Sequence, residues 1–192
     1  MNIGLYFGSF NPVHVGHLII ASHVANTTEV SQVWFVVSPH NPLKSSGTLL
    51  NEYHRLHLVQ LAIEGDNQLR ACDVEFKLPK PSYTIDTLTY LKEKFPSNQF
   101  SVILGSDSFK NLPKWKNFEN MISNNKFYVY ERPRHKVEET WDASVEILEA
   151  PLLDIAATTI RKKISDGQPI RYLVPEKVRE EIERNGYYKN CL

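Results

Sequence analysis

Two histidines near the start of the chain have the residue type and the spacing to do chemistry. His14 and His17 are three residues apart, with Gly16 between them and Gly8 upstream. Side chains at this spacing share one face of a helical turn, and glycine puts no side chain across that face. Imidazole nitrogens can donate hydrogen bonds to phosphate oxygens. The segment from Gly8 to His17 is therefore a candidate site for a polyphosphate.

The same pair has two other interpretations, because histidines at this spacing also occur as exposed surface residues and as metal ligands. No third ligand follows at a metal-binding spacing, and the sequence has no His-Glu-x-x-His pattern. We therefore expect no metal site built from protein side chains.

The elements around the histidines should place them at a turn from a strand to a helix. Residues 3–7 alternate apolar side chains with smaller or amphipathic ones, which predicts a short buried strand. Apolar residues then follow helical spacing, so a helix is expected over residues 12–27, with Pro12 at its first position and Asn11 as its cap. The free N–H groups and the macrodipole at such a helix start favour an anion.

The rest of the chain alternates predicted strands with predicted helices. This order favours an α/β fold with an open parallel sheet and helices on both faces. Further strands are expected over residues 33–37, 70–76, 100–104, 126–130 and 145–148. Helices are expected from Asn51 to Gly65, from Ser82 or Thr84 to Phe95, over residues 108–112, from Thr158 or Thr159 to Gly167, and from Pro175 to Asn185.

Two glycine-serine turns follow predicted strands, at Gly8 and at Gly105. In open α/β sheets a ligand binds outside the carboxyl ends of the strands where their order reverses, so these turns are expected to flank the site. Asp107 either accepts a hydrogen bond from a ribose hydroxyl or caps the helix over residues 108–112. Trp115 is expected more often in a core than as a platform for a ligand.

Basic residues supply further candidates, each with a simpler alternative. Lys44 lies in a long polar loop and either reaches a phosphate or is solvated. Arg161 and residues 162–163 crowd the first half of a short helix, where the dipole disfavours cations, so a bound anion would relieve the conflict; the alternative is a solvated basic face. Arg55 is expected on the surface, and residues 132–136 form a basic turn that is expected to be solvated.

Length and charge restrict the class of protein. A chain of 192 residues is most simply one domain, and 22 basic residues balance 22 acidic ones, so we expect neither nucleic acid nor a membrane as partner. Cys72 and Cys191 have no metal-binding or redox spacing. No apolar run approaches the ~20 residues of a membrane span. We expect a soluble protein of the cytoplasm; its oligomeric state is left open.

The opening motif, Gly8 to Pro12 followed by His14 to His17, resembles the signature of nucleotidyltransferases with a His-x-Gly-His motif. Further segments resemble bacterial nicotinate-mononucleotide adenylyltransferases and occur in that family's order. They are residues 39–44, 81–88, 104–108 with 112–115, and 155–161. The resemblance covers nearly the whole chain. It implies a Rossmann-like fold of the nucleotidyltransferase type, with residues 1–192 as a single domain on which a C-terminal helical part, about 155–192, packs.

The resemblance also implies the reaction. ATP and nicotinate mononucleotide would give nicotinate adenine dinucleotide and pyrophosphate in NAD biosynthesis, by direct in-line attack without a covalent intermediate, and Mg²⁺ would accompany ATP. The alternatives are a nicotinamide-mononucleotide or phosphopantetheine adenylyltransferase, which share the opening motif, and a nucleotide sensor without catalytic activity.

Site residues follow from the resemblance position by position. His14, His17 and Arg161 would be catalytic. ATP would bind to Gly8, Ser9, Phe10, His14, Gly16, His17, Lys44, Gly105, Asp107, Thr158 and Arg161. Nicotinate mononucleotide would bind to Ser9, Tyr83, Thr84, Asp107, Trp115 and Lys116, with backbone N–H groups near Thr84 receiving its carboxylate and Trp115 stacking on its pyridine ring.

The sequence departs from the family at two places. Asn11 stands where the commonest form of the motif has Asp, and the effect of this lost charge is open. Ala156 and Ala157 stand where the family commonly has two serines. Phosphate binding at that turn is therefore expected to depend on Thr158, Arg161 and the backbone.

Overall fold

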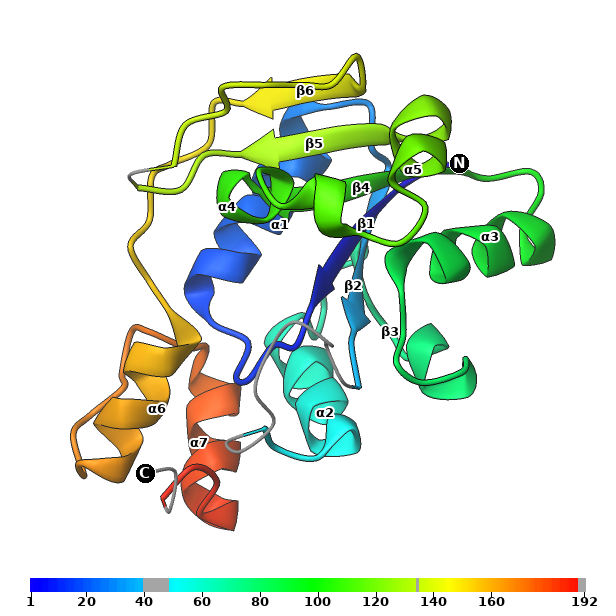
Figure 1. Cartoon of the computed structure of the whole chain (residues 1–192). Coiled ribbons are helices and arrows are strands. Elements are labelled where there is room, and N and C mark those ends of the chain that lie inside the picture. Colours follow the sequence, from blue (N-terminus) through cyan, green and yellow to red (C-terminus); the bar gives the residue numbers. More distant parts are fainter. Residues whose placement is uncertain (40–48, 134, 190–192) are drawn as a thin grey trace.

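Six parallel strands form one sheet in the order β3-β2-β1-β4-β5-β6 (Figure 1), in a computed structural model that describes residues 1–39, 49–133 and 135–189. The order reverses between β1 and β4, which are neighbours although two strands separate them in the sequence. The α/β fold with an open parallel sheet is thus confirmed. The strands are β1 (Asn2–Gly8), β2 (Gln32–Val37), β3 (Leu69–Cys72), β4 (Gln99–Gly105), β5 (Lys126–Tyr130) and β6 (Ser144–Leu148).

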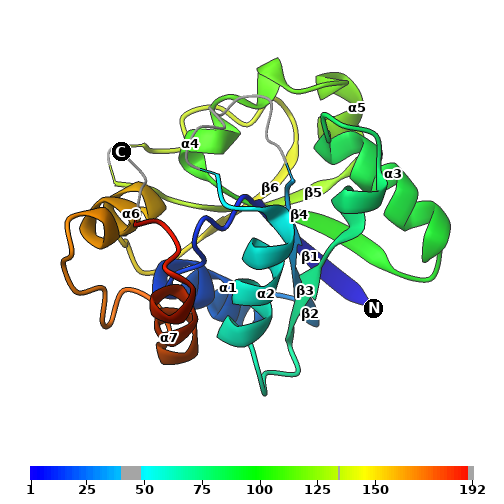
Figure 2. The same ribbon diagram turned by 90° about the horizontal axis from the view of Figure 1, so that it is seen from below.

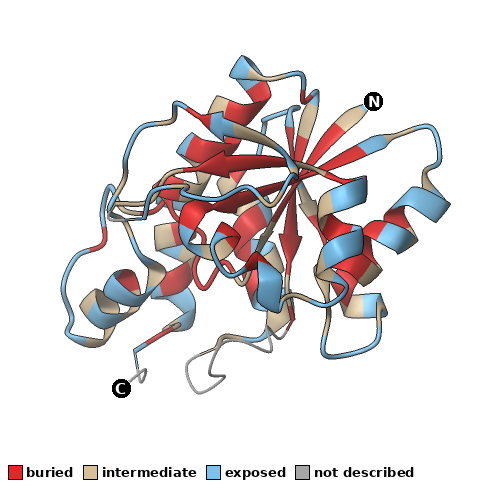
Figure 3. Cartoon of the chain, turned by 45° about the horizontal axis from the view of Figure 1, so that its top comes forward, coloured by how far each residue is buried: buried red, intermediate tan, exposed pale blue. Residues whose placement is uncertain are grey.

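Helices cover both faces of the sheet, as expected (Figure 2). One face packs against α1 (Val15–Thr27), α2 (Glu52–Ala62), α6 (Ala157–Ser165) and α7 (Glu176–Asn185). The other packs against α3 (Thr84–Lys94), α4 (Ser106–Phe109) and α5 (Phe118–Asn124), with the short 3₁₀ helices η1 (Val74–Lys77) and η2 (Leu112–Lys114). Since the central strands are buried on both faces, they are continuous apolar runs in the sequence (Figure 3).

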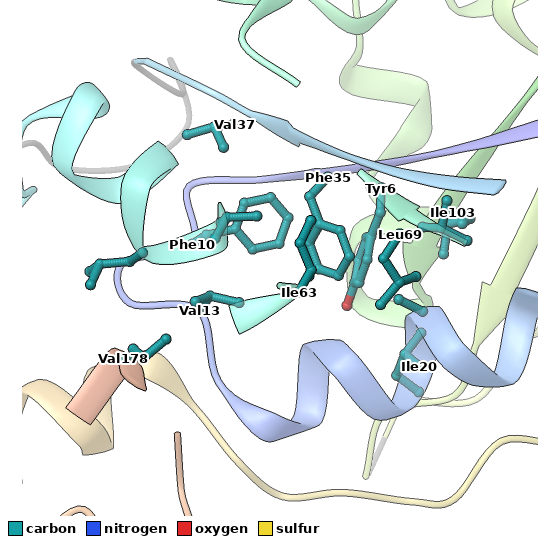
Figure 4. Packing of buried hydrophobic residues seen from close by; sticks show 14 of the residues in the cluster. Tyr6, Phe10, Val13, Ile20, Phe35, Val37, Ile63, Leu69, Ile103 and Val178 are labelled. Carbon is teal, nitrogen blue, oxygen red and sulfur yellow. The ribbon is translucent and has the colours of Figure 1, made fainter. Parts of the chain in front are cut away.

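The turn after β1 is anchored in the first of these cores. Phe10 is buried and packs edge-on against Tyr6, with ring centroids 5.8 Å apart, and Val13 has no exposed surface. Val178 of α7 belongs to the same cluster, so the C-terminal helices and the turn share one packed interior (Figure 4). Apolar burial on this scale fixes the backbone from Gly8 to His14 against the sheet.

Helix α1 begins later than predicted, at Val15 and not at Pro12. The predicted cap was wrong because the side chain of Asn11 is used elsewhere: its Oδ1 accepts a hydrogen bond from Leu50 N at 3.1 Å. Phe10, with φ of 44°, turns the chain first, and His14 is the residue that precedes the helix.

Helix α3 begins at Thr84, one of the two predicted positions, and Ser82 does not cap it because its hydroxyl donates to Glu75 Oε2 at 2.8 Å. Two other helix starts differ from the predictions. Gly105 precedes α4, which places Asp107 inside the first turn and not at a cap. Ala156 precedes α6, one residue ahead of the predicted range. Helix α2 begins after Asn51 as expected, with Asn51 Oδ1 accepting from Tyr53 N at 2.9 Å, but it ends at Ala62 and not at Gly65. Gly186 closes α7 as expected, with φ of 64°.

The predicted strand over residues 70–76 was wrong in its second half. Strand β3 ends at Cys72 and the chain turns into η1, because the Glu75 side chain is drawn inward, where it accepts hydrogen bonds from two hydroxyls. Among the described residues, no helix is long and apolar enough to cross a membrane.

Candidate active site

A cleft of about 730 Å³ opens at the carboxyl ends of β1, β4 and β5, where the strand order reverses. Its walls are the turn after β1, the start of α1, the turn into α4, the residues after β5 and the start of α6. Most of the residues expected to bind ATP line it: Gly8, Ser9, Phe10, His14, His17, Gly105, Asp107, Thr158 and Arg161. Gly16 lines a small adjoining cavity together with both histidines.

The two histidines are stacked at the start of α1. Their ring centroids are 3.6 Å apart at an interplanar angle of 25°, and the backbone N–H of His14 donates to His17 Nδ1 at 3.2 Å. Because Nδ1 accepts, a neutral His17 carries its proton on Nε2. The backbone thus selects the tautomer in which His17 can donate from Nε2.

His14 is the more enclosed of the pair, with 3% of its surface exposed. Burial, together with a smaller contribution from the positive charge of Arg132, lowers its pKa to about 4. His14 is therefore neutral near pH 7 and interacts by hydrogen bonding and not as a cation. Gly16 suits this packing, because a Cβ there would lie 3.1 Å from His14 Nδ1 and the ring would have to shift slightly.

Arg161 connects α6 to the opening motif. Its Nη1 donates to the carbonyl of Asn11 at 2.8 Å, so the guanidinium lies against the turn after β1 and lines the cleft with Thr158. The three residues that depart from the family pattern, Asn11, Ala156 and Ala157, also line the cleft. The start of α6 thus presents N–H groups, a hydroxyl and a cation to the same space.

The opposite wall carries a cation that the sequence did not identify. Residues 132–136 were expected to form a solvated turn, and His135 and Lys136 are exposed as expected, but Arg132 is half-buried and lines the cleft with Pro133 and His135. Arg132 N donates to Ser106 Oγ at 2.9 Å, and its Nε lies 3.9 Å from Asp107 Oδ1. Its position directly after β5, at the same sheet edge as Gly8 and Gly105, was the signal available in the sequence.

Four of the residues expected at the pyridine nucleotide do not line the cleft: Tyr83, Thr84, Trp115 and Lys116. They lie at the start of α3 and after η2, where Lys116 Nζ is 2.8 Å from Asp86 Oδ2 and 4.9 Å from the centroid of the Tyr83 ring. Trp115 is partly buried against the core on that face of the sheet. Lys44 lies outside the described residues.

Arg55 was expected on the surface, and the structure contradicts this. Its side chain has no exposed surface and donates to the carbonyls of four residues around the turn after β1. Its spacing was the missed signal: Arg55 lies three and four residues before Leu58 and Val59, on the buried face of α2.

Within residues 1–39, 49–133 and 135–189, no three His, Cys, Asp or Glu side chains are grouped to hold a metal ion. Two carboxylates, Asp107 and Asp154, line the cleft. Mg²⁺ is commonly held by substrate phosphates with one or two carboxylates and water, and the cleft suits that mode of binding.

A family model described as cytidylyltransferase-like matches residues 5–165. The chain is 47% identical to a Flavobacterium johnsoniae protein named "Probable nicotinate-nucleotide adenylyltransferase", over 98% of this chain and all of that protein. It is 46% identical to the protein of the same name from Cytophaga hutchinsonii, over 99% of this chain and all of the relative. Among solved structures, the Plasmodium falciparum nicotinic acid mononucleotide adenylyltransferase complexed with NaAD superposes with a TM-score of 0.83 at 22% identity, covering 98% and 97% of the two chains.

Proposed function

Since the chain belongs to the cytidylyltransferase-like family and, within it, to the nicotinate-nucleotide adenylyltransferases, we propose that it transfers the adenylyl group of ATP to nicotinate mononucleotide. The products are nicotinate adenine dinucleotide and pyrophosphate, in NAD biosynthesis. The single observation that supports this most directly is the stacked pair His14 and His17 at the start of α1, inside the cleft at the β1–β4 reversal.

The transfer is a direct displacement at phosphorus. An oxygen of the 5′-phosphate of nicotinate mononucleotide forms a bond to the α-phosphorus of ATP. The bond from that phosphorus to the oxygen bridging to the β-phosphate breaks, and pyrophosphate leaves with the electron pair. Catalysis then consists of aligning two anions and stabilising the charge that develops on the transferring group.

The residues of the cleft have the chemistry for these tasks. His17, with its proton on Nε2, donates to an oxygen of the α-phosphate, and neutral His14 adds a second polar contact beside it. Thr158 and Arg161 hold the β- and γ-phosphates from α6, and Asp107 accepts from a ribose hydroxyl. The macrodipole at the start of α1 favours the same negative charge, although its first N–H groups are already bonded, Val15 N to Leu173 O and His17 N to His14 O.

Magnesium would be held mainly by oxygens of the polyphosphate and by water, with Asp107 and Asp154 as the carboxylates within the cleft. When bound, the ion neutralises part of the charge on the leaving pyrophosphate.

The pyridine nucleotide is placed at the start of α3. Backbone N–H groups near Thr84 and after Trp115 receive its carboxylate, and Trp115 stacks on the ring. A carboxylate only accepts hydrogen bonds, whereas the NH₂ of a nicotinamide would meet donor with donor. The site therefore prefers the acid to the amide.

A pyrophosphate-release assay tests this function. The protein is given ATP and Mg²⁺ with nicotinate mononucleotide, nicotinamide mononucleotide or phosphopantetheine as acceptor. We expect turnover with the acid and a kcat/KM at least about tenfold lower with the amide, the size expected for opposed buried donors. Equal efficiency with acid and amide contradicts the carboxylate argument. ATP binding without pyrophosphate release from any acceptor indicates a sensor.

A further inference from the structure

Two charged side chains lie fully buried beneath the site and take no part in the chemistry proposed above. Arg55 of α2 has no exposed surface, and Glu75 of η1 is 2% exposed. In the described part of the chain, no other Asp, Glu, Lys or Arg is buried to this degree, and neither side chain lines the cleft. A buried charge is costly unless hydrogen bonds satisfy it, so the contacts of these two side chains indicate what they hold.

Arg55 holds the phosphate-binding turn to the neighbouring strand. Its Nη1 donates to the carbonyl of Ser9 at 2.6 Å and to that of Ser38 at 2.8 Å. Its Nη2 donates to Pro39 O at 3.0 Å and its Nε to Leu50 O at 2.7 Å. One guanidinium therefore fixes the backbone after β1, the backbone after β2 and the start of α2 relative to one another.

Glu75 holds the start of α3 in a comparable way. Its Oε2 accepts from the Ser82 hydroxyl at 2.8 Å, and its Oε1 accepts from the Thr87 hydroxyl at 3.0 Å. The side chain of Ser38 is a third donor to the same carboxylate. The contacts with Ser82 and Thr87 flank Tyr83 and Thr84 in the sequence, so Glu75 fixes the segment that contains these two residues.

Ser38 joins the two charged groups. Its carbonyl accepts from Arg55, its side chain donates to Glu75, and its N–H donates to Gly8 O at 2.9 Å. A path of polar contacts, buried at Arg55 and Glu75 and half-buried at Ser38, thus connects the turn after β1 with the start of α3. Charged groups held in such networks are hydrogen-bonded at fixed geometry and tolerate little displacement.

We propose that Arg55, Ser38 and Glu75 form one positioning unit that sets the placement of the two substrate subsites, the phosphate-binding turn after β1 and the start of α3, relative to each other. This rests on the proposed function, which puts ATP at the first subsite and the pyridine nucleotide at the second. Because a buried ion often stabilises a fold no more than an apolar residue of similar volume would, we assign these two charged side chains a positioning role.

The first test removes one hydroxyl at a time from the α3 end of the unit. Thr87→Val and Ser82→Ala should each raise the KM for nicotinate mononucleotide by about three- to tenfold, the size expected for loss of a hydrogen bond to a charged group. Equilibrium binding of ATP to the free enzyme should stay within about twofold, because the turn after β1 is untouched. Ser101→Ala is the matched control, a buried hydroxyl of β4 that donates to Ile3 O and should change neither constant.

The second test measures the coupling between Arg55 and Glu75. Arg55→Lys and Glu75→Gln keep the size and part of the polarity of each side chain. We expect Arg55→Lys to weaken ATP binding and Glu75→Gln to raise the KM for nicotinate mononucleotide. In the double variant the loss in kcat/KM should be smaller than the product of the two single losses, as for residues of one network.

The outcomes separate this proposal from the proposed function. If the wild-type enzyme releases no pyrophosphate from ATP and nicotinate mononucleotide, the proposed function is wrong. If the wild type is active but Thr87→Val and Ser82→Ala leave both constants unchanged, as the control Ser101→Ala does, the positioning unit is wrong. The proposal is also wrong if the loss in kcat/KM of the double variant equals the product of the losses of the Arg55→Lys and Glu75→Gln variants. The hydroxyl variants decide the matter if the charge variants fail to fold.

Discussion

His17 receives its orientation and its tautomer from the backbone N–H of His14, so it is already set to donate from Nε2. We expect His17→Ala to lower kcat by about 10²–10³-fold, as measured for the loss of one preorganised donor to a transition state. Single-turnover kinetics with saturating ATP would measure this loss.

His23→Ala is the matched control for that variant. His23 lies on the same helix, two turns further along, and does not line the cleft. Its replacement should leave kcat unchanged. A folded His17→Ala enzyme with wild-type kcat would contradict the role given to His17.

The depressed pKa of His14 makes stability depend on pH in one direction. The folded state holds this group at a pKa of about 4, below the ordinary 6.5, so the unfolded chain binds more protons between these values. Stability is then full above about pH 6.5 and is lost as the pH falls toward 4, by roughly 3 kcal/mol from this group.

Urea unfolding at a series of pH values measures the effect. The difference in unfolding free energy between the wild type and His14→Gln should shrink as the pH falls from 7 to about 4, because glutamine does not titrate. A difference that stays constant over this range would mean that burial does not depress the pKa of His14.

Spacing alone was enough to find the histidines, because a helical turn brings residues three apart onto one face. The spacing of Arg55 before Leu58 and Val59 also indicated a buried face, but this signal was outweighed because a lone arginine in a helix is usually solvated. The partners of Arg55 and Arg132 are backbone carbonyls and side chains distant in the sequence, which spacing does not identify.

At the scale of elements, the turn from β4 into α4 sets the position of Asp107. A Cβ on Gly105 would lie 2.5 Å from Asp107 Oδ1 and 3.2 Å from Cζ of Tyr130. Gly105→Ala must therefore displace the carboxylate that is proposed to accept from ribose. We expect the KM for ATP to rise by about tenfold or more, the size of a lost hydrogen bond to a charged group.

Gly167→Ala is the control for a glycine-to-alanine substitution away from the cleft. Gly167 closes α6 with φ of 68°, and a Cβ at this position would meet no other group within 4 Å. This variant should lower stability by about 1 kcal/mol through backbone strain and leave the KM for ATP unchanged. If the KM for ATP is unchanged in Gly105→Ala, Asp107 does not contribute to ATP binding.

Strands were predicted well where both faces are buried and poorly where a polar side chain turns inward. The apolar runs in β2, β4 and β5 were found within one residue at each end. The end of β3 was missed because Glu75 turns inward and accepts hydrogen bonds from the hydroxyls of Ser82 and Thr87. The local sequence pattern does not contain such a tertiary contact. The start of α1 was missed for the same kind of reason, since Asn11 binds Leu50 N.

At the scale of the molecule, the site exists because β1 and β4 are neighbours. Strand spacing in the sequence does not specify which strands pair, and the reversal was expected only from the general behaviour of open α/β sheets. The two glycine turns were therefore placed correctly beside the cleft. The four residues at α3 and η2 were grouped by the resemblance alone, and the path from Glu75 to Arg55 had no signal in the sequence.

The C-terminal helices test whether the chain unfolds as one unit. Ile182 of α7 is 1% exposed and belongs to the same apolar cluster as Phe10 and Val13. Ile182→Ala should lower the free energy of unfolding by about 2–4 kcal/mol, the usual range for such a truncation in a core. Because the cluster is shared, the loss should appear in the whole molecule and not in residues 155–192 alone.

Two probes distinguish these cases, since all three tryptophans, at positions 34, 115 and 141, lie outside the C-terminal part. Tryptophan fluorescence therefore reports on the sheet and the helices packed on its other face, whereas far-UV circular dichroism includes α6 and α7. We expect both signals of Ile182→Ala to change in one transition at the same urea concentration, below that of the wild type. If the dichroism changes first and the fluorescence midpoint stays at the wild-type value, the C-terminal helices unfold on their own, and Arg161 reaches the cleft from a separable unit.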